Sequence, residues 1–337
     1  MQRVYVTGAA GFIGFHLSEH LLAEGIRVHG HDGMTAYYDL ALKRGRLAIL
    51  QGREGFGFTE AMLEDHARLA DDMARFRPDV VVHLGAQAGV RYSLEAPRSY
   101  LSSNIEGTFN VLEAARDCGV KHLLLASTSS VYGANTAMPY RETDKADTQV
   151  SLYAATKKAT EALSHSWAHL WGLPVTCFRF FTVYGPWGRP DMAPFKFTRA
   201  ILQGEPIDVY GHGQMFRDFT YVTDLVRAIR LLMEKVPERP APGAPIPDGD
   251  SLSPVAPWRV VNIGNGEKVT LGDFIAAIEK ATGRTAVRNL MEMQKGDVQA
   301  TWADNSLLAR LTGYRPETGI EAGMAAFVAW YREHYGV

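Results

Sequence analysis

Short apolar runs alternate with stretches of helical periodicity through the first half of the chain, and this alternation restricts the possible folds more than any other feature. The clearest runs are residues 79–84 (DVVVHL) and 122–127 (HLLLAS), which are apolar at successive positions, as in strands covered on both faces of a sheet. Strands that are separated by helices form right-handed βαβ units. The sequence therefore predicts an α/β fold with a parallel, doubly wound sheet.

The expected elements follow one another in a regular order up to residue 185. Strands are expected at residues 3–7, 26–31, 56–58, 79–84, 122–127 and 175–181. Helices are expected at residues 12–24, 39–50, 65–76, 97–117 and 151–171. Beyond residue 185 the segments become shorter and richer in Gly and Pro, and helices are expected at residues 271–282, 305–311 and 320–334. The segment 236–257 contains seven prolines and is expected to be an exposed loop or linker.

Composition argues against several classes of function. The 35 Lys and Arg residues and 37 Asp and Glu residues give a formal charge of −2, which offers no basic field to nucleic acid or to an anionic membrane. Two cysteines, Cys118 and Cys177, suit a reducing cytosol, and no Cys and His cluster has metal-site spacing. No apolar run approaches the roughly 18–20 residues that span a bilayer. We therefore expect a cytoplasmic protein with no bound metal, nucleic-acid partner or membrane span.

A glycine-rich turn joins the first expected strand to the first expected helix. Gly8, Gly11 and Gly14 lie in the segment 7–14 (TGAAGFIG), where the strand ends and the helix begins. A turn without side chains lets a pyrophosphate approach the backbone, and the helix N-terminus offers free N–H groups and a positive dipole end. The same spacing also occurs in plain strand-to-helix turns, so its surroundings decide between the two interpretations.

Asp32 helps to decide between these interpretations, because it lies at the end of the second expected strand, 18 residues after Gly14. A carboxylate at this place can accept hydrogen bonds from the ribose hydroxyls of adenosine. It repels a 2′-phosphate, which favours NAD over NADP. A surface aspartate at a strand end is the alternative, but the preceding glycines favour a dinucleotide site.

Tyr153 and Lys157 form a YxxxK pattern inside an expected helix, where residues four apart share a face. An ammonium beside a phenol favours the phenolate and lowers a pKa that is ordinarily near 10. A tyrosine of this kind can remove a hydroxyl proton near neutral pH. The strand that ends at Ser127 and Thr128 supplies hydroxyl groups for the same substrate oxygen. The order of glycine turn, acidic strand end, hydroxyl strand end and YxxxK indicates a dehydrogenase-type active site.

The chain resembles the extended short-chain dehydrogenase/reductase family, and within it the UDP-glucuronate 4-epimerases. The resemblance is carried by TGAAGFIG, LGAQAGVRYSLEAPRSY, STSSVYG, SLYAATKKATE, RFFTVYGPWGRPDM, KFTRAI and RDFTYVTD, and more loosely by VVNIGN and KGDVQATWAD. It implies a Rossmann-type domain, bound NAD and oxidation of the sugar at C4. It also implies roles for single residues: Tyr153 as the base, Lys157 as its pKa-lowering partner and a ligand of the nicotinamide ribose, Thr128 as the hydroxyl partner, and Gly8, Gly11, Phe12, Ile13, Gly14 and Asp32 as cofactor ligands.

One position departs from the family pattern. Met62 stands where the family usually has an aspartate that accepts a hydrogen bond from the adenine amino group. A thioether is a poor acceptor, whereas Leu63 can still cover the adenine ring. The departure affects the adenine contact and leaves the expected reaction unchanged.

Two serines after Thr128 bear on the reaction that follows oxidation. Relatives that dehydrate or decarboxylate the sugar carry acidic residues where this chain has Ser129 and Ser130. Neither serine is an effective acid or base at neutral pH. The hydride is then expected to return to the opposite face, which is C4 epimerisation. A UDP-glucuronate decarboxylase, a dehydratase, a UDP-hexose 4-epimerase and a non-catalytic NAD(H)-sensing scaffold remain alternatives.

The substrate is expected to be a UDP-hexuronic acid, UDP-glucuronate or UDP-galacturonate. Thr182 stands where UDP-galactose epimerases have an asparagine, and with Ser127 and Ser129 it can hold a C6 carboxylate through charge-assisted hydrogen bonds. Arg189 can add positive charge, or can instead pair with Asp191. Further substrate ligands are expected at the diphosphate and the sugar nucleotide: Arg217, Arg91 and Asp297.

The predicted organisation has two parts. Residues 1–185 are expected to form the NAD-binding domain with the catalytic pair. Residues 186–337 are expected to form mainly a smaller substrate-binding lobe, with some segments that return to the first domain. The long helices 97–117 and 151–171 correspond to those that relatives pair across a two-fold axis, so a homodimer is expected.

Overall fold

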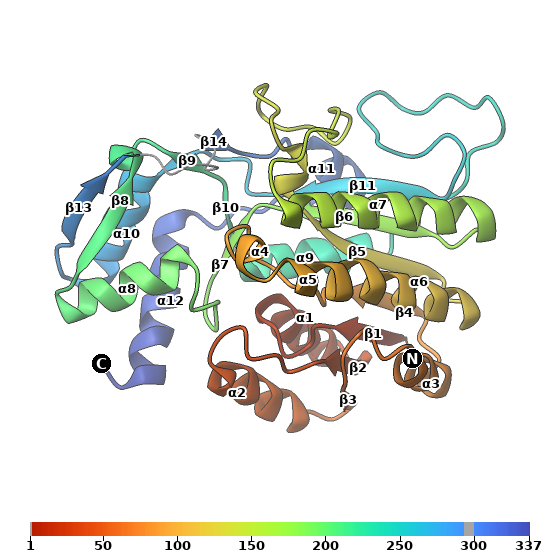
Figure 1. Ribbon diagram of the computed structural model, residues 1–337, viewed down its shortest axis with the longest axis horizontal. Coiled ribbons are helices and arrows are strands. Elements are labelled where there is room, and N and C mark those ends of the chain that lie inside the picture. Colours follow the sequence, from red (N-terminus) through yellow and green to blue (C-terminus); the bar gives the residue numbers. More distant parts are fainter. Residues whose placement is uncertain (1, 293–299) are drawn as a thin grey trace.

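A computed structural model describes residues 2–292 and 300–337 of the chain. Its centre is a seven-stranded sheet in which neighbouring strands pair in parallel, in the order β11-β6-β5-β4-β1-β2-β3 (Figure 1). The strands are β1 (Arg3–Thr7), β2 (Arg27–Asp32), β3 (Phe56–Glu60), β4 (Val80–His83), β5 (His122–Thr128), β6 (Val175–Phe180) and β11 (Trp258–Ile263). The predicted parallel, doubly wound α/β fold is confirmed.

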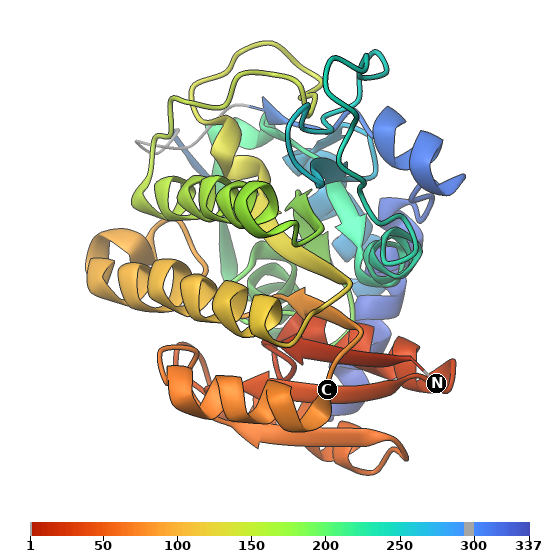
Figure 2. The same cartoon turned by 90° about the vertical axis from the view of Figure 1, so that its right-hand side faces the viewer.

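Helices cover both faces of this sheet, which explains why its strands are apolar at successive positions (Figure 2). Val4, Val6 and Val28 face a core shared with α1 (Phe12–Ala23), α9 (Val222–Leu232) and α11 (Ser306–Thr312). Tyr5, Val81 and Leu123 face the other core, shared with α3 (His66–Phe76), α6 (Gly107–Asp117) and α7 (Leu152–Trp171). The remaining early helix, α2 (Leu40–Gln51), follows β2 and begins after Asp39, whose side chain accepts a hydrogen bond from the Ala41 N–H.

The expected helix 97–117 is helical throughout but is not one regular α-helix. It consists of α5 (Pro97–Tyr100), a π-helical segment η1 (Leu101–Glu106) and α6. The short helix α4 (Tyr92–Glu95) precedes it. A π-helical turn inside an α-helix shifts the side chains that follow it and is frequent near functional sites. Apolar periodicity alone does not reveal such a turn.

The chain after residue 185 forms a smaller lobe at one end of the sheet (Figure 1). Its helices are α8 (Ala193–Gln203), α10 (Leu271–Thr282) and α12 (Ile320–Tyr335), packed together around Phe274 and Phe327. Its strands form small sheets: β8 (Pro206–Tyr210) with β13 (Val287–Met291), β10 (Phe219–Tyr221) with β7 (Thr182–Tyr184), and β9 (Phe216–Arg217) with β12 (Val269–Thr270) and β14 (Ala300–Thr301). Two short 3₁₀ turns complete the elements, η2 (Ser129–Tyr132) and η3 (Gly211–Gly213).

Three elements from this later part of the chain nevertheless pack on the large sheet. β11 extends the sheet beside β6, and α9 and α11 cover one of its faces. The proline-rich segment 236–257 contains no helix or strand and leads from α9 to β11. Its far end is fixed to α7, because His165 and Ser253 share a hydrogen bond of 2.8 Å between Nε2 and Oγ. Among the described residues, no helix has both the length and the apolarity that crossing a bilayer requires.

The strand order reverses between β1 and β4, because the chain moves outward to β2 and β3 and then returns to the other side of β1. In open α/β sheets the loops separate at such a reversal and leave a crevice at the carboxyl ends of the strands. Gly8 follows β1, Gly85 follows β4, and Asp32 ends β2, so all three lie at this edge. The fold therefore brings the glycine turn and the acidic strand end to one place.

Candidate active site

A cleft at the carboxyl edge of the sheet brings together most of the residues that the sequence singled out. It is lined by residues from the loops after β1, β2, β3 and β4, from the end of β5, and from α7. The predicted site residues among its lining are Gly8, Gly11, Phe12, Ile13, Gly14, Asp32, Leu63, Ser127, Tyr153, Lys157 and Arg189. Residues predicted for a cofactor and for catalysis thus share one cavity.

The glycine turn is packed so closely that side chains are excluded from it. Gly8 has φ +70°, and a Cβ there would lie 2.8 Å from the Gly85 nitrogen. A Cβ on Gly14 would lie 2.1 Å from the Gly8 oxygen, so helix α1 approaches the turn as closely as the backbone allows. Gly11 precedes the first residue of α1 and offers no side-chain cap, which leaves the helix N–H groups to the cleft. This cradle fits a dinucleotide pyrophosphate.

Asp32 is buried at the end of β2, and its carboxylate is tightly held. Its Oδ2 accepts a hydrogen bond from the Ala10 N–H at 3.1 Å, and its Oδ1 accepts one from the Met34 N–H at 2.8 Å. Lys43 of α2 also reaches Oδ1 at 3.3 Å. These contacts fix the carboxylate at the cleft wall, where ribose hydroxyls can reach it. The amide of Asn110 donates to the Leu63 carbonyl at 2.9 Å and so fixes the neighbouring wall.

Tyr153 and Lys157 lie one turn apart on α7 and both line the cleft. Burial raises the pKa of Tyr153 above its ordinary value, while a hydrogen bond with the Thr128 hydroxyl and the positive charge of Arg189 lower it. Burial also lowers the pKa of Lys157 to about 8, against the opposing charge of Glu161. The sequence led us to expect a lowered phenol pKa, and the protein alone shows the reverse, because burial outweighs the favourable charges.

Asn104 connects this pair to the loop after β4. Its Oδ1 accepts a hydrogen bond from the Gln87 N–H at 2.8 Å, and its Nδ2 donates to the Gln87 carbonyl at 3.1 Å. The same Nδ2 lies 3.1 Å from the Thr156 hydroxyl, which itself donates to the Tyr153 carbonyl at 2.9 Å. The ring of Tyr100 packs edge-on against that of Tyr153. The π-helical segment therefore supports the cleft wall and the catalytic helix together.

Arg189 reaches the cleft from the loop between β7 and α8 as half of an ion pair. Its Nε and Nη2 donate to the two oxygens of Asp191 at 3.1 and 2.6 Å. The Tyr37 hydroxyl donates to the same carboxylate at 3.1 Å, and the guanidinium lies 5.7 Å from the Tyr37 ring centre. The pairing with Asp191 that the sequence left open is thus present. It holds the guanidinium beside Tyr153, whose pKa responds to its charge.

Five predicted residues that the structure describes are not among those that line this cleft. Thr128 contacts Tyr153 from the end of β5, and Ser129 begins η2 directly after it. Thr182 opens β7, where its N–H donates to the Asp218 carbonyl at 3.0 Å. Arg217 is on β9 and donates to the Phe216 carbonyl at 2.8 Å. Arg91 is exposed before α4, with its guanidinium 5.8 Å from the ring centre of Tyr210, and Asp297 lies outside the described residues.

Several site residues escaped the sequence analysis because their partners are distant along the chain. Lys43 is 11 residues from Asp32, Tyr37 is 154 from Asp191, and Asn104 is 52 from Thr156. A further residue next to the site, Glu161, did leave a signal in the sequence. Glu161 follows Lys157 by one helical turn, so its carboxylate is expected on the same helix face as Tyr153 and Lys157.

A family model described as the NAD dependent epimerase/dehydratase family matches residues 4–244. The chain belongs to this family. A probable UDP-glucuronate 4-epimerase of Rhizobium meliloti is 53% identical over 333 residues, which cover 99% of this chain and 98% of that protein. UDP-glucuronate 4-epimerase 1 of Arabidopsis thaliana is 44% identical over 340 residues, covering 99% of this chain and 77% of the plant protein.

Solved structures agree with the sequence relatives. A UDP-glucuronic acid 4-epimerase from Bacillus cereus, in complex with UDP-glucuronic acid and NAD, has a TM-score of 0.87 and 31% identity, with 99% of this chain and 100% of that chain covered. A UDP-glucose 4-epimerase of Thermotoga maritima with UDP-glucose has a TM-score of 0.85 and 29% identity, with the same coverage. The predicted family resemblance is confirmed.

Proposed function

We propose that this protein is an NAD-dependent epimerase that interconverts UDP-glucuronate and UDP-galacturonate by inverting C4 of the hexuronic acid. One observation carries the proposal: Tyr153 and Lys157 line the same cleft as the glycine turn and Asp32. A base for a sugar hydroxyl therefore lies beside a site built for a dinucleotide. The relatives named as UDP-glucuronate 4-epimerases, and the solved relative with UDP-glucuronic acid and NAD, support this choice of substrate and cofactor.

The residues of the cleft fit NAD. Backbone N–H groups at Phe12 and Ile13 open α1 toward the pyrophosphate, with Gly8, Gly11 and Gly14 keeping the turn free of side chains. Asp32 is assigned to the adenosine ribose and Leu63 to the adenine ring, while Met62 offers no strong acceptor to the adenine amino group. The chemistry that bound NAD would supply here is reversible acceptance of the C4 hydrogen as a hydride. Asp32 favours NAD because its charge repels a 2′-phosphate.

Three side chains are assigned to proton transfer at the C4 oxygen. Tyr153 removes the hydroxyl proton when the sugar is oxidised and returns it when the ketone is reduced. Lys157 carries a positive charge that favours the phenolate and also binds the nicotinamide ribose. Thr128 donates a hydrogen bond to the oxygen on which charge develops. Inversion then requires the keto sugar to turn over in the cleft while the nucleotide stays bound.

Other residues are assigned to the two ends of the sugar nucleotide. Arg217, Arg91 and Asp297 are proposed to hold the diphosphate and nucleotide during this rotation. Arg189, Thr182, Ser127 and Ser129 are the sequence-based candidates for the C6 carboxylate. If these residues hold the carboxylate so that its bond to the sugar ring lies near the plane of the C4 ketone, that bond cannot align with the carbonyl π system. The intermediate, a β-keto acid, would then keep its CO₂.

A decarboxylase or dehydratase is less well supported. These reactions need an acid or base beyond the first oxidation, and the positions after Thr128 hold Ser129 and Ser130. A UDP-hexose 4-epimerase would lack a use for a positive charge beside the sugar, which Arg189 provides. A non-catalytic NAD(H)-sensing scaffold would need neither Tyr153 nor Lys157 in the cleft.

The finer organisation of the protein is also proposed. We assign residues 1–185 to cofactor binding and catalysis and residues 186–337 mainly to the sugar nucleotide. A homodimer formed through η1, α6 and α7 is supported by apolar side chains exposed on these helices, Leu101, Phe109, Leu170 and Trp171. A cytoplasmic location is supported by the two cysteines, which are free.

Turnover of purified protein tests the function directly. Incubation with UDP-glucuronate alone, without added NAD, is expected to give a mixture of the two C4 isomers, because bound NAD is regenerated in each cycle. Chromatography separates the isomers, and trapped CO₂ reports decarboxylation. CO₂ with UDP-pentose would instead indicate a decarboxylase, and no turnover of any UDP-sugar would indicate a scaffold.

A further inference from the structure

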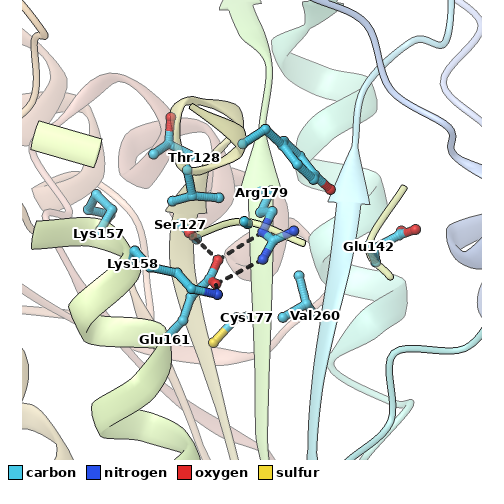
Figure 3. Close-up of polar contacts among 12 residues, drawn as sticks. Ser127, Thr128, Glu142, Lys157, Lys158, Glu161, Cys177, Arg179 and Val260 are labelled. Carbon is cyan, nitrogen blue, oxygen red and sulfur yellow. Dashed lines mark hydrogen bonds and ion pairs between the residues drawn. The ribbon is translucent and has the colours of Figure 1, made fainter. Parts of the chain in front are cut away.

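A buried ion pair on α7 and β6 contacts Ser127, a residue that lines the cleft (Figure 3). Glu161 of α7 and Arg179 of β6 form a two-pronged salt bridge, with Nε–Oε1 and Nη2–Oε2 distances of 2.9 Å. Both side chains are almost fully buried. Lys158 adds a third cationic contact to Oε2 at 3.3 Å, and the Tyr132 ring covers Arg179 at 4.6 Å. The carboxylate is therefore ionised and firmly held.

Ser127 shares this carboxylate. Its Oγ lies 2.6 Å from Oε1 of Glu161, as Figure 3 shows at the end of β5. The charge of Arg179 outweighs the effect of burial and keeps the pKa of Glu161 below its ordinary value, so the carboxylate has no proton to give. The hydrogen in this contact must come from Ser127, and a bond of this length from hydroxyl to carboxylate is of the strong, charge-assisted kind.

This hydrogen bond limits what Ser127 can offer to a ligand in the cleft, which Ser127 lines together with Tyr153 and Lys157. A serine hydroxyl has one hydrogen and two lone pairs. With the hydrogen committed to Glu161, only lone pairs remain for a ligand. A carboxylate also has only lone pairs, so it would be repelled at this position, whereas a sugar hydroxyl can donate to it.

We propose that Glu161 is a positioning residue that makes Ser127 a hydrogen-bond acceptor, so that Ser127 binds a hydroxyl of the hexose ring and does not hold the substrate's carboxylate. This rests on the function proposed above and changes one of its assignments: Arg189, Thr182 and Ser129 remain for the carboxylate. An acceptor at the base of the cleft would also favour sugar orientations that keep the carboxylate away from it.

The alternative, in which Ser127 donates to the substrate, would have to break a strong bond. Turning the hydroxyl toward the cleft would leave Oε1 of Glu161 with Arg179 alone and would lose a charge-assisted hydrogen bond in a buried place. The substrate carboxylate offers a bond of the same kind, so the exchange brings no net gain. The ion pair thus makes the acceptor state the lower in energy.

Dissociation constants for two ligands separate these possibilities. They are measured by calorimetry in the Tyr153→Phe background, where turnover is expected to be at least about 10²-fold slower, for UDP-glucuronate and for UDP-glucose, which has no carboxylate. Ser127→Ala removes the hydroxyl and leaves the Glu161–Arg179 pair intact. We expect both constants to rise by the same factor, roughly tenfold for one lost hydrogen bond. With Tyr153 restored, Ser127→Ala should release no more CO₂ than the wild type.

Glu161→Gln tests the positioning role. The effect of this substitution on both constants should disappear when Ser127 is already alanine, because Glu161 acts through that hydroxyl. If Glu161 had a purely structural role, the factors by which the two substitutions raise each dissociation constant would multiply in the double variant. If Glu161→Gln does not fold, as a melting curve would reveal, the wild-type protein still offers a test. The Ser127 hydroxyl should give a slowly exchanging, downfield proton resonance that is missing from Ser127→Ala.

Weaker binding of UDP-glucuronate alone, or CO₂ release by Ser127→Ala, would overturn the proposal, since both results identify a carboxylate donor. Dissociation constants that Ser127→Ala leaves unchanged for both ligands, relative to the Tyr153→Phe protein, would also overturn it. The proposed function fails differently, by absence of isomer interconversion in the wild-type protein. The binding constants remain measurable in that case, so the two failures can be told apart.

Discussion

Burial acts on Tyr153 and Lys157, the proposed catalytic pair, by the same rule and with opposite signs. It raises the pKa of Tyr153 and lowers that of Lys157 to about 8, since it disfavours the charged form of each. The phenolate needed for proton abstraction therefore depends on nearby positive charge. Arg189 supplies such charge, Lys157 is proposed to add to it, and the positive ring of oxidised NAD would do so when bound.

Replacing Lys157 with methionine is expected to slow isomer interconversion by roughly 10²- to 10⁴-fold, the range typical of a lost proton-transfer component. The rise of kcat with pH should also move to higher pH, because the phenol loses the charge that favours its ionised form. Rates measured from pH 6 to 10 check both effects. Lys157→Arg keeps the charge and should lose less. A methionine variant with the wild-type pH profile would contradict this role.

Glu142 gives a prediction about stability. Burial raises its pKa from 4.5 to about 7, although the Asn262 N–H donates to it at 2.8 Å. Between these pH values the unfolded chain releases the proton and the folded chain retains it, so the free energy of unfolding falls as pH rises. The difference between the two pKa values corresponds to a decrease of up to about 3 kcal/mol in the free energy of unfolding, and this decrease is complete above pH 7.

Glu142→Gln keeps an acceptor for the Asn262 N–H and removes the ionisation. Its free energy of unfolding should match the wild type near pH 4.5 and exceed it by about 1–3 kcal/mol at pH 8. Urea unfolding at the two pH values measures the difference. A variant that is less stable than the wild type at pH 8 would show that the ionised carboxylate is well solvated or paired.

Residues whose role follows from neighbours in the sequence were predictable. Gly8, Asp32 and Tyr153 belong to short patterns in which spacing alone fixes the geometry, and the structure brings them to one cleft. Glu161 and Arg179 were not predicted as a pair: the spacing from Lys157 places Glu161 on the same helix face, but a buried ion pair between a helix and a strand leaves no local pattern. The direction of the Ser127 hydroxyl depends on that pair and was equally inaccessible.

At the scale of elements, periodicity predicted the strands and helices of the sheet well. β3 continues to Glu60, two residues beyond the predicted strand, and α1 ends at Ala23, one residue before its predicted end. The π-helical segment η1 was missed, since an extra residue in one turn hardly alters an apolar pattern. That segment carries Asn104, whose three contacts join the Gln87 loop to α7.

Asn104→Ala is expected to lower the free energy of unfolding by about 2–3 kcal/mol, because it leaves the Gln87 N–H without its partner in a buried place. It should also weaken retention of NAD, since Gln87 and its neighbours line the cleft. Denaturant unfolding and the amount of NAD that copurifies are the two measurements. Ser102→Ala, in the same segment, removes only a local contact to the Ser99 carbonyl and serves as the control. Equal behaviour of both variants would count against a role for η1.

At the scale of the whole molecule, the chain crosses between its two parts. β11 joins the large sheet after the smaller lobe has begun, and α9 and α11 pack on that sheet. The sequence predicted that some later segments return to the first domain, but it did not identify β11 as a strand of the large sheet. Pairing between β6 and β11 joins residues more than 80 positions apart, and no local pattern records such a register.

The proposed dimer is testable on an aromatic row that crosses two helices. Phe109 of α6 packs against Trp167 of α7, which packs against Trp171, and Phe109 and Trp171 are 41% and 49% exposed. Phe109→Glu places a charge in this row and should shift the protein from dimer to monomer. Sedimentation velocity measures the change, with Val236→Glu as a control at an exposed site elsewhere. Equal sedimentation of both variants and the wild type would exclude this surface.

Proton abstraction by Tyr153 is the central step of the proposed reaction. Tyr153→Phe removes a single oxygen and keeps the ring that packs against Tyr100. The direct measurement is interconversion of UDP-glucuronate and UDP-galacturonate by this variant, with bound NAD quantified in the same sample. We predict that the variant retains NAD and interconverts the isomers at least about 10²-fold more slowly than the wild type. Interconversion at the wild-type rate would contradict the mechanism.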